Sequence, residues 1–164
     1  MIFKSLVLTW LLGLSLTAWA QRDVDLMDWK EGDIPPPPAF DAGKLLTFEV
    51  VAGSSMVFGV DPATLRISDD GIVRYVMVAT SASGTRNVWY EGLRCATGEF
   101  KTYARHSPEG TWSKVVNAEW RSVFGTMPSK HALQFGRAGA CDNAAPGSSV
   151  NDIIHRLKAG RFNR

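Results

Sequence analysis

The three histidines are the side chains best suited to bind a metal ion or to move a proton near neutral pH, and they lie at positions 106, 131 and 155. These positions match neither an H-x-H nor an H-E-x-x-H spacing, so the sequence predicts no metal site. The chain also contains no G-x-S-x-G, S-x-x-K, P-loop or dinucleotide-binding motif. We therefore assign no catalytic residue and expect no cofactor.

A group of charged and aromatic residues could form a binding surface on two neighbouring predicted strands. Its members are Arg74, Arg86, Trp89, Glu91 and Arg94. Alternation along a strand places Trp89 and Glu91 on one face and Arg94 on the other. We favour a cross-strand Arg–Glu pair beside an aromatic core. The functional alternative is a surface that binds anions, peptides or glycans.

An enzymatic alternative needs residues that the fold would have to bring together. A small hydrolase could assemble a site from His106, Glu91 and Asp61 if a concave pocket joined them. No motif supports such a site, so the sequence favours a protein that is not an enzyme but does not decide the question.

The N-terminal residues have the pattern of a secretory signal peptide. A short start that contains Lys4 is followed by an apolar run over residues 5–17, which is too short to cross a bilayer comfortably. The run ends in Ala18-Trp19-Ala20, a small-x-small cleavage signature. We predict a signal peptide over residues 1–20, a mature chain that begins at Gln21 without a membrane span, and a periplasmic location. An uncleaved anchor is the alternative.

Export determines how the two cysteines are interpreted. Cys95 and Cys141 are the only thiols in the chain. In an oxidising compartment, two cysteines in a small domain most simply form one structural disulfide. The alternative is a redox-active or nucleophilic thiol, which the absence of a C-x-x-C motif disfavours.

The composition changes sharply after the predicted cleavage site. Residues 21–38 carry five acidic and two basic side chains and end in four consecutive prolines, which cannot form a helix or a central strand. Residues 39–164 carry 15 basic and 11 acidic side chains. We predict an acidic arm over 21–38, either a strap folded onto the domain or a free tether, and one globular domain over 39–164. The nearly balanced total charge of +2 argues against nucleic-acid binding.

The globular part is predicted to have an α+β fold built on an antiparallel meander. Runs rich in β-branched and aromatic residues, separated by short turns, predict strands over 45–51, 56–60, 64–68, 72–80, 87–94 and 99–105. Asp69-Asp70-Gly71 predicts a hairpin turn. A short helix is predicted over residues 117–124, and Gly136 to Ala140 is interpreted as a turn.

A C-terminal helix is the clearest helical element. Val150, Ile153 and Leu157 follow helical spacing, Ser149 is placed to cap the start, and Gly160 is placed to end the helix. We expect this helix to pack on one face of the sheet, which completes an α+β domain with one disulfide.

Three blocks of sequence resemble a known family. They are residues 58–62 (FGVDP), 70–75 (DGIVRY) and 83–95 (SGTRNVWYEGLRC), of which YEGLRC is the most specific. Together with Cys141 and the terminal helix, they are similar to the cryptic neisserial protein family of exported beta-proteobacterial proteins. The resemblance implies an envelope location and one small domain, and it implies no activity.

The sequence leaves three hypotheses for function. The first is a periplasmic binding or adaptor module, whose candidate partner is another envelope protein. The second is the small hydrolase described above. The third is an envelope structural or stress protein without a ligand. We favour the first, because exported domains without a catalytic motif more often bind than catalyse. The sequence does not define an oligomeric state.

Overall fold

The structure is a computed structural model that describes residues 28–50 and 55–162. By its internal contacts the chain divides into two units, residues 1–31 and 32–164, and the fold described below is that of the second. The predicted signal peptide over residues 1–20 lies outside the described residues.

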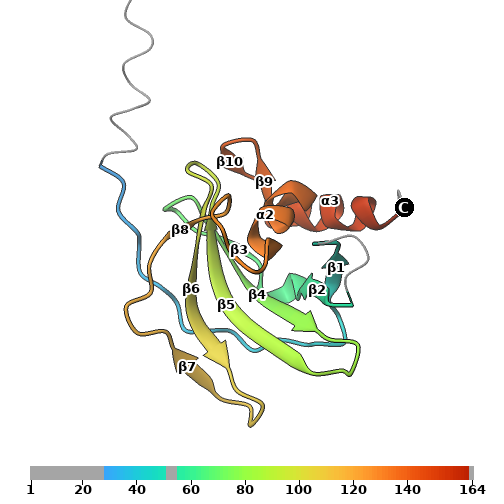
Figure 1. Cartoon of the computed structure of the whole chain (residues 1–164). Helices are drawn as coiled ribbons and strands as arrows, with labels where there is room; N and C mark the ends of the chain where they lie inside the picture. Colours follow the sequence, from blue (N-terminus) through green and yellow to red (C-terminus); the bar gives the residue numbers. More distant parts are fainter. Residues whose placement is uncertain (1–27, 51–54, 163–164) are drawn as a thin grey trace, which may run out of the picture. The chain divides into compact units, whose positions relative to one another are not determined.

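An antiparallel sheet is the centre of the fold, as predicted. Its strands lie in the order β1 (Leu46–Phe48), β2 (Val57–Val60), β4 (Ile72–Thr80), β5 (Arg86–Arg94), β6 (Glu99–His106) and β7 (Trp112–Lys114). Two short strands complete it: β3 (Arg66–Ile67) pairs with β4, and β8 (Arg121–Ser122) pairs with β6. The long strands β4, β5 and β6 follow one another in sequence, which is the predicted meander (Figure 1).

The edge of β4 is covered by two short strands instead of one long one. β2 pairs with the second half of β4 and β3 with the first half, and the 3-10 turn η1 (Pro62–Thr64) connects them. Asp61 caps this turn by accepting a hydrogen bond from the Ala63 backbone N–H at 2.9 Å. The predicted hairpin turn before β4 is confirmed, and Gly71 has the positive φ of 77° that favours glycine there.

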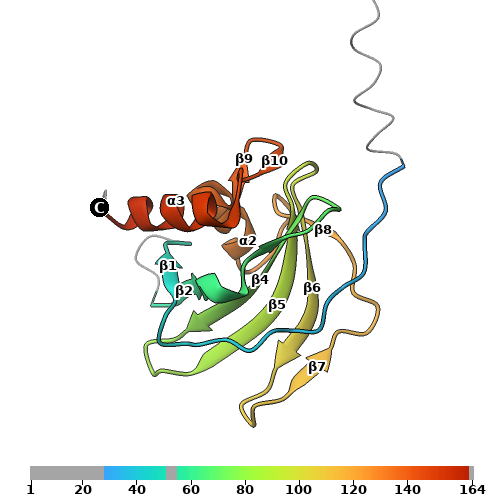
Figure 2. The ribbon, with the colours of Figure 1, turned by 180° about the vertical axis from the view of Figure 1, so that it is seen from behind.

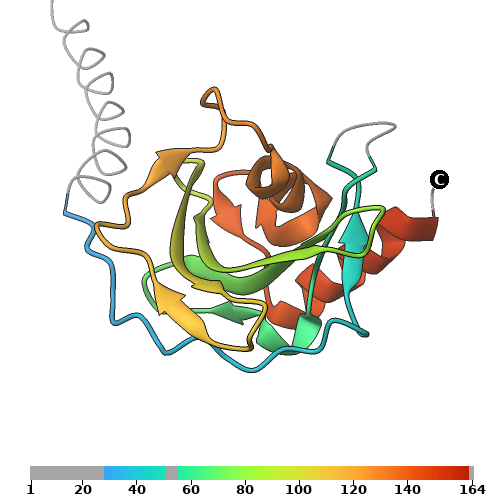
Figure 3. The same cartoon turned by 60° about the horizontal axis from the view of Figure 1, so that its bottom comes forward.

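The helices cover one face of the sheet, as predicted for the C-terminal helix. α2 (His131–Phe135) continues into a π-helical turn, η2 (Gly136–Ala140), and α3 (Val150–Phe162) ends the described chain. Phe135 of α2 packs on Tyr75 of β4, with ring centroids 4.3 Å apart, and Ile153 and Leu157 of α3 join the same buried cluster. A small hairpin of β9 (Cys141–Asp142) and β10 (Ala145–Pro146) links the helices. Figure 3 shows this helical layer on one side of the curved sheet.

The predicted disulfide is present and ties the two layers together. Cys95 follows β5 and Cys141 begins β9, and their Cα atoms are 5.7 Å apart. The bond therefore fixes the end of a central strand to the segment between the two helices.

Three local predictions were wrong. Residues 117–124 form no helix, because Asn117 has a left-handed φ of 53° and Arg121–Ser122 instead extend the sheet as β8. Gly136–Ala140 continue α2 as a π-helical turn in which Gly139 has a non-helical φ of 134°, and α2 was itself missed because its five residues are too few to show a period. α3 continues to Phe162, two residues past Gly160, and its predicted cap is confirmed: Asp152 N donates to Ser149 Oγ at 3.1 Å.

Among the residues that the structure describes, no helix combines the length and the apolar character needed to cross a membrane.

Candidate functional site

The two faces of β5 have different environments, and this separates the predicted site residues. Trp89 and Leu93 point to the helical side, where they belong to the larger buried cluster around Tyr75 and Phe135. Val88 and Tyr90 belong to a second cluster on the opposite side, together with Tyr103 and Ala104 of β6. The side chains of β5 therefore alternate between the two faces of the sheet, as the sequence predicts.

Glu91 lies at the centre of a buried polar cluster on the helical side. Only 1% of its surface is exposed. Tyr75 donates its hydroxyl hydrogen to Oε2 at 3.2 Å, and Thr102 donates to Oε1 at 3.1 Å. His131 Nε2 lies 2.9 Å from Oε2, so β4, β5, β6 and α2 all meet at this carboxyl group. Burial, together with the adjacent Glu91 carboxyl, raises the pKa of Tyr75 well above its ordinary value.

The sequence shows His131 only as one of three histidines without a metal-binding spacing. It predicts neither His131 nor Ser129 as a site residue. The ring of His131 lies parallel to those of Phe58 and Trp89, with centroids 5.9 and 5.6 Å away, and Phe100 meets it edge-on. Ser129 Oγ lies 2.9 Å from Nδ1. A serine, a histidine and a glutamate are thus connected in series, but His131 is only 7% exposed and lines no described cavity. The arrangement holds α2 on the sheet.

The three arginines of the predicted surface lie in different environments. Arg74 is 1% exposed and forms an ion pair with Asp70 at 2.7 Å. Arg94 is 9% exposed and lies 3.7 Å from Glu99, whereas Arg86 is exposed at the start of β5. Glu91 is paired with His131, and the cross-strand Arg–Glu pair that the structure shows in this region joins Arg94 of β5 to Glu99, directly opposite it on β6. Together with Trp89 and Glu91, the five residues divide between the two faces of the sheet.

The three residues of the hydrolase alternative are not brought together. His106 contacts the rings of Phe40 and Trp112 at the end of β6. Glu91 lies in the buried cluster, and Asp61 binds the backbone N–H groups of η1 and of Asp41. None of the three residues lines the cavity described below. Within the residues that the structure describes, no group of three or more His, Cys, Asp or Glu side chains could hold a metal.

The opposite face of the sheet is crossed by an extended segment, residues 32–40, which we call the strap (Figure 2). At its first residue, the backbone N–H of Gly32 donates to Asp70 Oδ2 at 3.0 Å. At its last residue, the ring of Phe40 lies edge-on to His106 and Trp112, at centroid distances of 5.1 and 6.0 Å. The strap is therefore attached at both ends. Between them, the prolines have fixed φ and no N–H to donate to the sheet.

A cavity of about 360 Å³ lies between the strap and the sheet. Its walls come from the strap, from β5 and β6, and from β7 and the loop that follows it. They comprise Ile34, Pro35, Pro36, Pro37, Tyr90, Lys101, Tyr103, Ala104, Lys114, Val115 and Ala118. Ligand pockets have volumes from about 300 Å³ upwards and combine apolar walls with a few polar groups, which is the character of this cavity.

The tyrosine floor of the cavity depends on a glycine. A Cβ atom at Gly92 would overlap the Tyr103 hydroxyl and lie 2.9 Å from its ring carbon Cε2. Because β5 has no side chain there, the Tyr103 ring lies across the strand, 5.4 Å from the Tyr90 ring. Burial raises the pKa of Tyr90, so its hydroxyl is neutral and can donate a hydrogen bond.

Two lysines supply the charge of the cavity walls. Lys101 Nζ lies 5.8 Å from the ring centre of Tyr103 and 5.7 Å from that of Trp120. Such cation–π contacts restrict the position of the ammonium group. Lys114 is more exposed and lies on β7, opposite Ala104 of β6. No aspartate or glutamate is among the lining residues, so the lining residues carry only positive charge.

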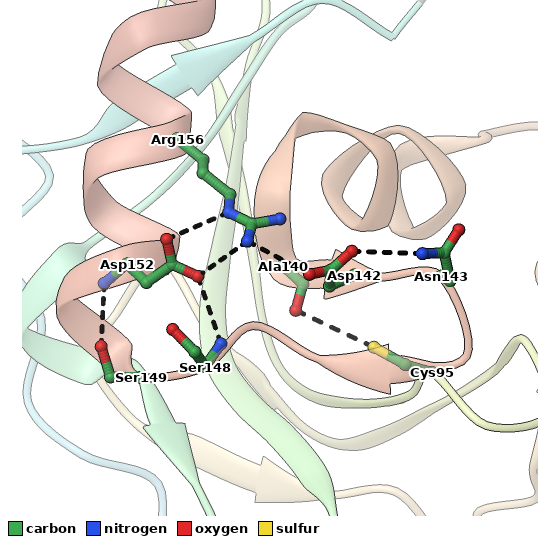
Figure 4. A network of polar contacts seen from close by, with 8 residues as sticks. All are labelled: Cys95, Ala140, Asp142, Asn143, Ser148, Ser149, Asp152 and Arg156. Carbon is green, nitrogen blue, oxygen red and sulfur yellow. Dashed lines mark hydrogen bonds and ion pairs between the residues drawn. The ribbon is translucent and has the colours of Figure 1, made fainter.

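Neither cysteine of the disulfide lines this cavity, and Cys95 lies beside a polar network on the helical side (Figure 4). Arg156 of α3 pairs with Asp152 at 3.1 Å and with Asp142 of β9 at 3.3 Å. The hydrogen bond from Arg156, with further bonds from Ser148, holds the pKa of Asp152 below its ordinary value. These contacts position β9 against α3, and we assign no catalytic or binding role to them.

A sequence model of the CNP1-like family matches residues 25–158, which include the sheet, the strap, α2 and most of α3. The chain belongs to the CNP1-like family. It is 26% identical to Cryptic neisserial protein 1 of Neisseria gonorrhoeae (strain ATCC 700825 / FA 1090), over 96% of this chain and 93% of that protein. No solved structure is similar to this chain. The resemblance seen in the sequence is thus confirmed, and membership of the CNP1-like family assigns no activity to the cavity.

Proposed function

We propose that this protein is a binding module of the bacterial periplasm, and that the cavity between the strap and the sheet is its binding site. The proposed location is supported by the signal-peptide pattern before Gln21 and by the Cys95–Cys141 disulfide, which suits an oxidising compartment.

The cavity is the observation that carries the proposal. It is lined by two tyrosines, two lysines and a proline-rich segment. Binding sites typically have few polar groups in a mainly apolar, preformed hollow. Catalysis would also need an acid, a base or a nucleophile in the cavity, and apart from the two lysines and two tyrosines the lining residues offer none.

The attachment of the strap gives the binding site a defined shape. Gly32 and Phe40 fix the two ends, and the prolines between them are conformationally restricted. A preformed site loses less conformational entropy when it binds a ligand than a site made by a free loop. The sequence favours an adaptor function, and we propose that the protein acts as an adaptor through the molecule that binds in this cavity.

The test is a fragment screen by NMR on the mature chain, with neutral, anionic and cationic aromatic fragments. Ala118 lines the cavity, so Ala118→Trp should fill it, and Ala82→Trp in the exposed turn between β4 and β5 is the matched control. We expect at least one class of fragment to shift the resonances of lining residues, and Ala118→Trp alone to abolish the shifts.

Melting curves verify that both variants are folded, and Val115→Trp replaces Ala118→Trp if the latter does not fold. If no class of fragment perturbs the lining residues, or if binding persists in a folded variant with a filled cavity, the binding site is not here. The envelope structural protein without a ligand is then the better description.

A further inference from the structure

We infer that the outer edge of β7 is a second binding surface, to which an extended segment of another protein adds as an antiparallel strand, with an acidic residue opposite Lys114. The strap cavity lies on one face of the sheet, whereas this surface is its edge, so neither proposal needs the other. The unpaired backbone of β7, its single charge and the exposed apolar side chain that follows it favour this partner.

β7 is the last strand of the described sheet, and its inner side pairs with β6 (Figure 1). Val115 N donates to Tyr103 O at 2.9 Å, so Val115 faces β6. Successive residues of an antiparallel strand direct their backbone groups to opposite sides. Lys114 and Trp112 therefore direct their N–H and C=O groups away from β6. No group in the described part of the chain is hydrogen-bonded to these backbone groups.

A partner strand would continue the ladder of the sheet at this edge. Each outward residue offers one donor and one acceptor. In strand addition, main-chain hydrogen bonds supply the affinity and side chains supply the specificity. The open edge is short, because Gly110 has a positive φ of 89° in the turn before β7 and Asn117 has a left-handed φ of 53° after it. An extended segment of about five residues would therefore span it.

Lys114 determines the charge that a partner strand must carry. It is the only charged residue between Gly110 and Val116, its side chain is exposed, and it forms no ion pair with the residues that the structure describes. Directly opposite residues of an antiparallel pair are close enough for opposite charges to stabilise the pair and like charges to destabilise it. The favoured residue opposite Lys114 is therefore glutamate or aspartate.

Apolar side chains lie on both sides of Lys114 in the sequence. Trp112 is half-buried, and Val116 is 84% exposed, the highest value among the large apolar residues that the structure describes. Residues opposite these two would lie two positions before and two positions after the acidic residue of the partner. Apolar residues at those positions would remove part of this surface from water. The partner segment therefore has an acidic residue with an apolar residue two positions away on each side.

A second copy of this chain fits the edge less well than such a segment. Pairing of two β7 edges would bring a second Lys114 to the same short ladder, where the two ammonium groups repel each other. Lysine on an exposed edge strand is one of the ways in which proteins avoid pairing with their own copies. The same lysine attracts an acidic strand, so the charge of the edge selects a different partner.

The experiment titrates the mature chain by NMR with three heptapeptides that are acetylated and amidated at their ends. The first is Ser-Val-Thr-Glu-Thr-Val-Ser, the second has lysine in place of its glutamate, and the third is the first with the glutamate nitrogen methylated. We expect the first to bind about fivefold more tightly than the second. The third lacks a backbone donor at the central position and should not bind detectably.

Hydrogen exchange shows whether the bound peptide adds as a strand. The amide hydrogens of Trp112 and Lys114 face outwards, so the first peptide should slow their exchange with solvent. The amide of Val115, which is already bonded to Tyr103, is the internal control and should change little.

Substitutions at position 114 separate the charge from the backbone. Lys114→Glu should reverse the preference between the first two peptides, and Lys158→Glu, on the exposed surface of α3, is the matched control that should not. Lys114→Gln keeps the outward amide and should bind both peptides equally. Lys114→Pro lacks that amide but keeps the ladder with β6, so it should bind both about fivefold more weakly than Lys114→Gln. Melting curves verify that the variants are folded, and the methylated peptide tests the same hydrogen bonds if Lys114→Pro is not.

The other outcomes overturn this inference in distinguishable ways. Equal binding of the first two peptides, or an unchanged preference in Lys114→Glu, would exclude an acidic partner. Undiminished binding of the methylated peptide, or binding without protection of the Trp112 amide, would exclude strand addition. Slow exchange of this amide without peptide, together with self-association in sedimentation, would identify a second copy as the occupant.

The results also separate this inference from the proposed function. Trp112 does not line the strap cavity, so peptide-induced shifts confined to the lining residues would place the peptide in the cavity and overturn the edge as its site. If no peptide binds while aromatic fragments still perturb the lining residues, the inference of a β7 partner is wrong and the cavity remains a binding site. If the first peptide binds at the edge and no fragment binds, the cavity proposal alone fails.

Discussion

His131 Nε2 lies 2.9 Å from Glu91 Oε2, although the two residues are 40 positions apart in the sequence. The pair joins the short helix α2 to the central strand β5, and both side chains are nearly inaccessible to water. Burying a pair of this kind costs desolvation free energy. Removing one partner costs more, because the other side chain is then buried without a partner.

We expect Glu91→Ala to reduce the free energy of unfolding by about 3–5 kcal/mol, since it leaves Tyr75, Thr102 and His131 without their common acceptor. Glu91→Gln keeps one carbonyl acceptor and should cost about half as much. Urea denaturation measures both values. Equal, small losses below about 1 kcal/mol in both variants would mean that the cluster does not hold α2 on the sheet.

The disulfide should contribute about 4 kcal/mol to the free energy of unfolding, because it closes a loop between residues 46 positions apart. We expect the Cys95→Ser, Cys141→Ser double variant to lose most of this amount in a denaturant titration. Mass spectrometry of the exported protein after alkylation should find no free thiol. Two alkylated cysteines in the exported protein would contradict the assignment.

The Asp70–Arg74 pair should make stability depend on pH in the acidic range. Burial alone would raise the pKa of Asp70, but the hydrogen bond from Arg74 and those from two backbone N–H groups outweigh it, so the pKa lies below the ordinary 3.8. A carboxyl group whose pKa is lowered on folding stabilises the fold above its unfolded pKa, and this contribution is lost as the pH falls through the folded value.

Asp70→Asn should therefore reduce the free energy of unfolding by about 2 kcal/mol near pH 7, and the difference from wild type should shrink as the pH falls below 3.8. Urea titrations at pH 7, 5 and 3 measure it. Lys44→Gln, which removes an exposed ion pair with Asp41, is the control and should change stability little at any of these pH values. A difference that grows on acidification would contradict the assignment.

The strap should loosen when its Phe40 attachment is removed. Phe40→Ala deletes the ring that packs against His106 and Trp112, so we expect faster amide exchange and faster proteolysis within residues 32–40. Because the ring is only half-buried, the global loss of stability should be about 1–2 kcal/mol. Val116→Ala, at a side chain that is 84% exposed, should change neither readout. Unchanged exchange in Phe40→Ala would show that the strap is held elsewhere.

Export should remove the first 20 residues. We expect the protein recovered from the periplasm of a bacterial host to begin at Gln21, and its intact mass to show the loss of residues 1–20. Replacing Ala18 and Ala20 with leucines should block cleavage and leave the longer chain associated with the membrane. Recovery of a full-length chain from the cytoplasm would contradict both the signal peptide and the proposed location.

The sequence by itself determined the elements whose cause is local. The residues of β4 and β6, the Gly71 turn and the Ser149 cap were predicted correctly, because strand propensity, turn chemistry and capping depend on a few neighbouring residues. The pairing of Cys95 with Cys141 also followed, since two cysteines allow one intramolecular disulfide.

Tertiary structure decided what depends on distant contacts. β8 replaced a predicted helix, because pairing with β6 outweighed a weak local preference. The environment of Glu91 was set by His131 on a helix too short to show a period. The cavity needs the strap, Tyr103 and Lys114 to meet across the sheet, and no local pattern encodes that meeting. The physical reason is that burial and charge pairing act between residues that only the folded chain brings together.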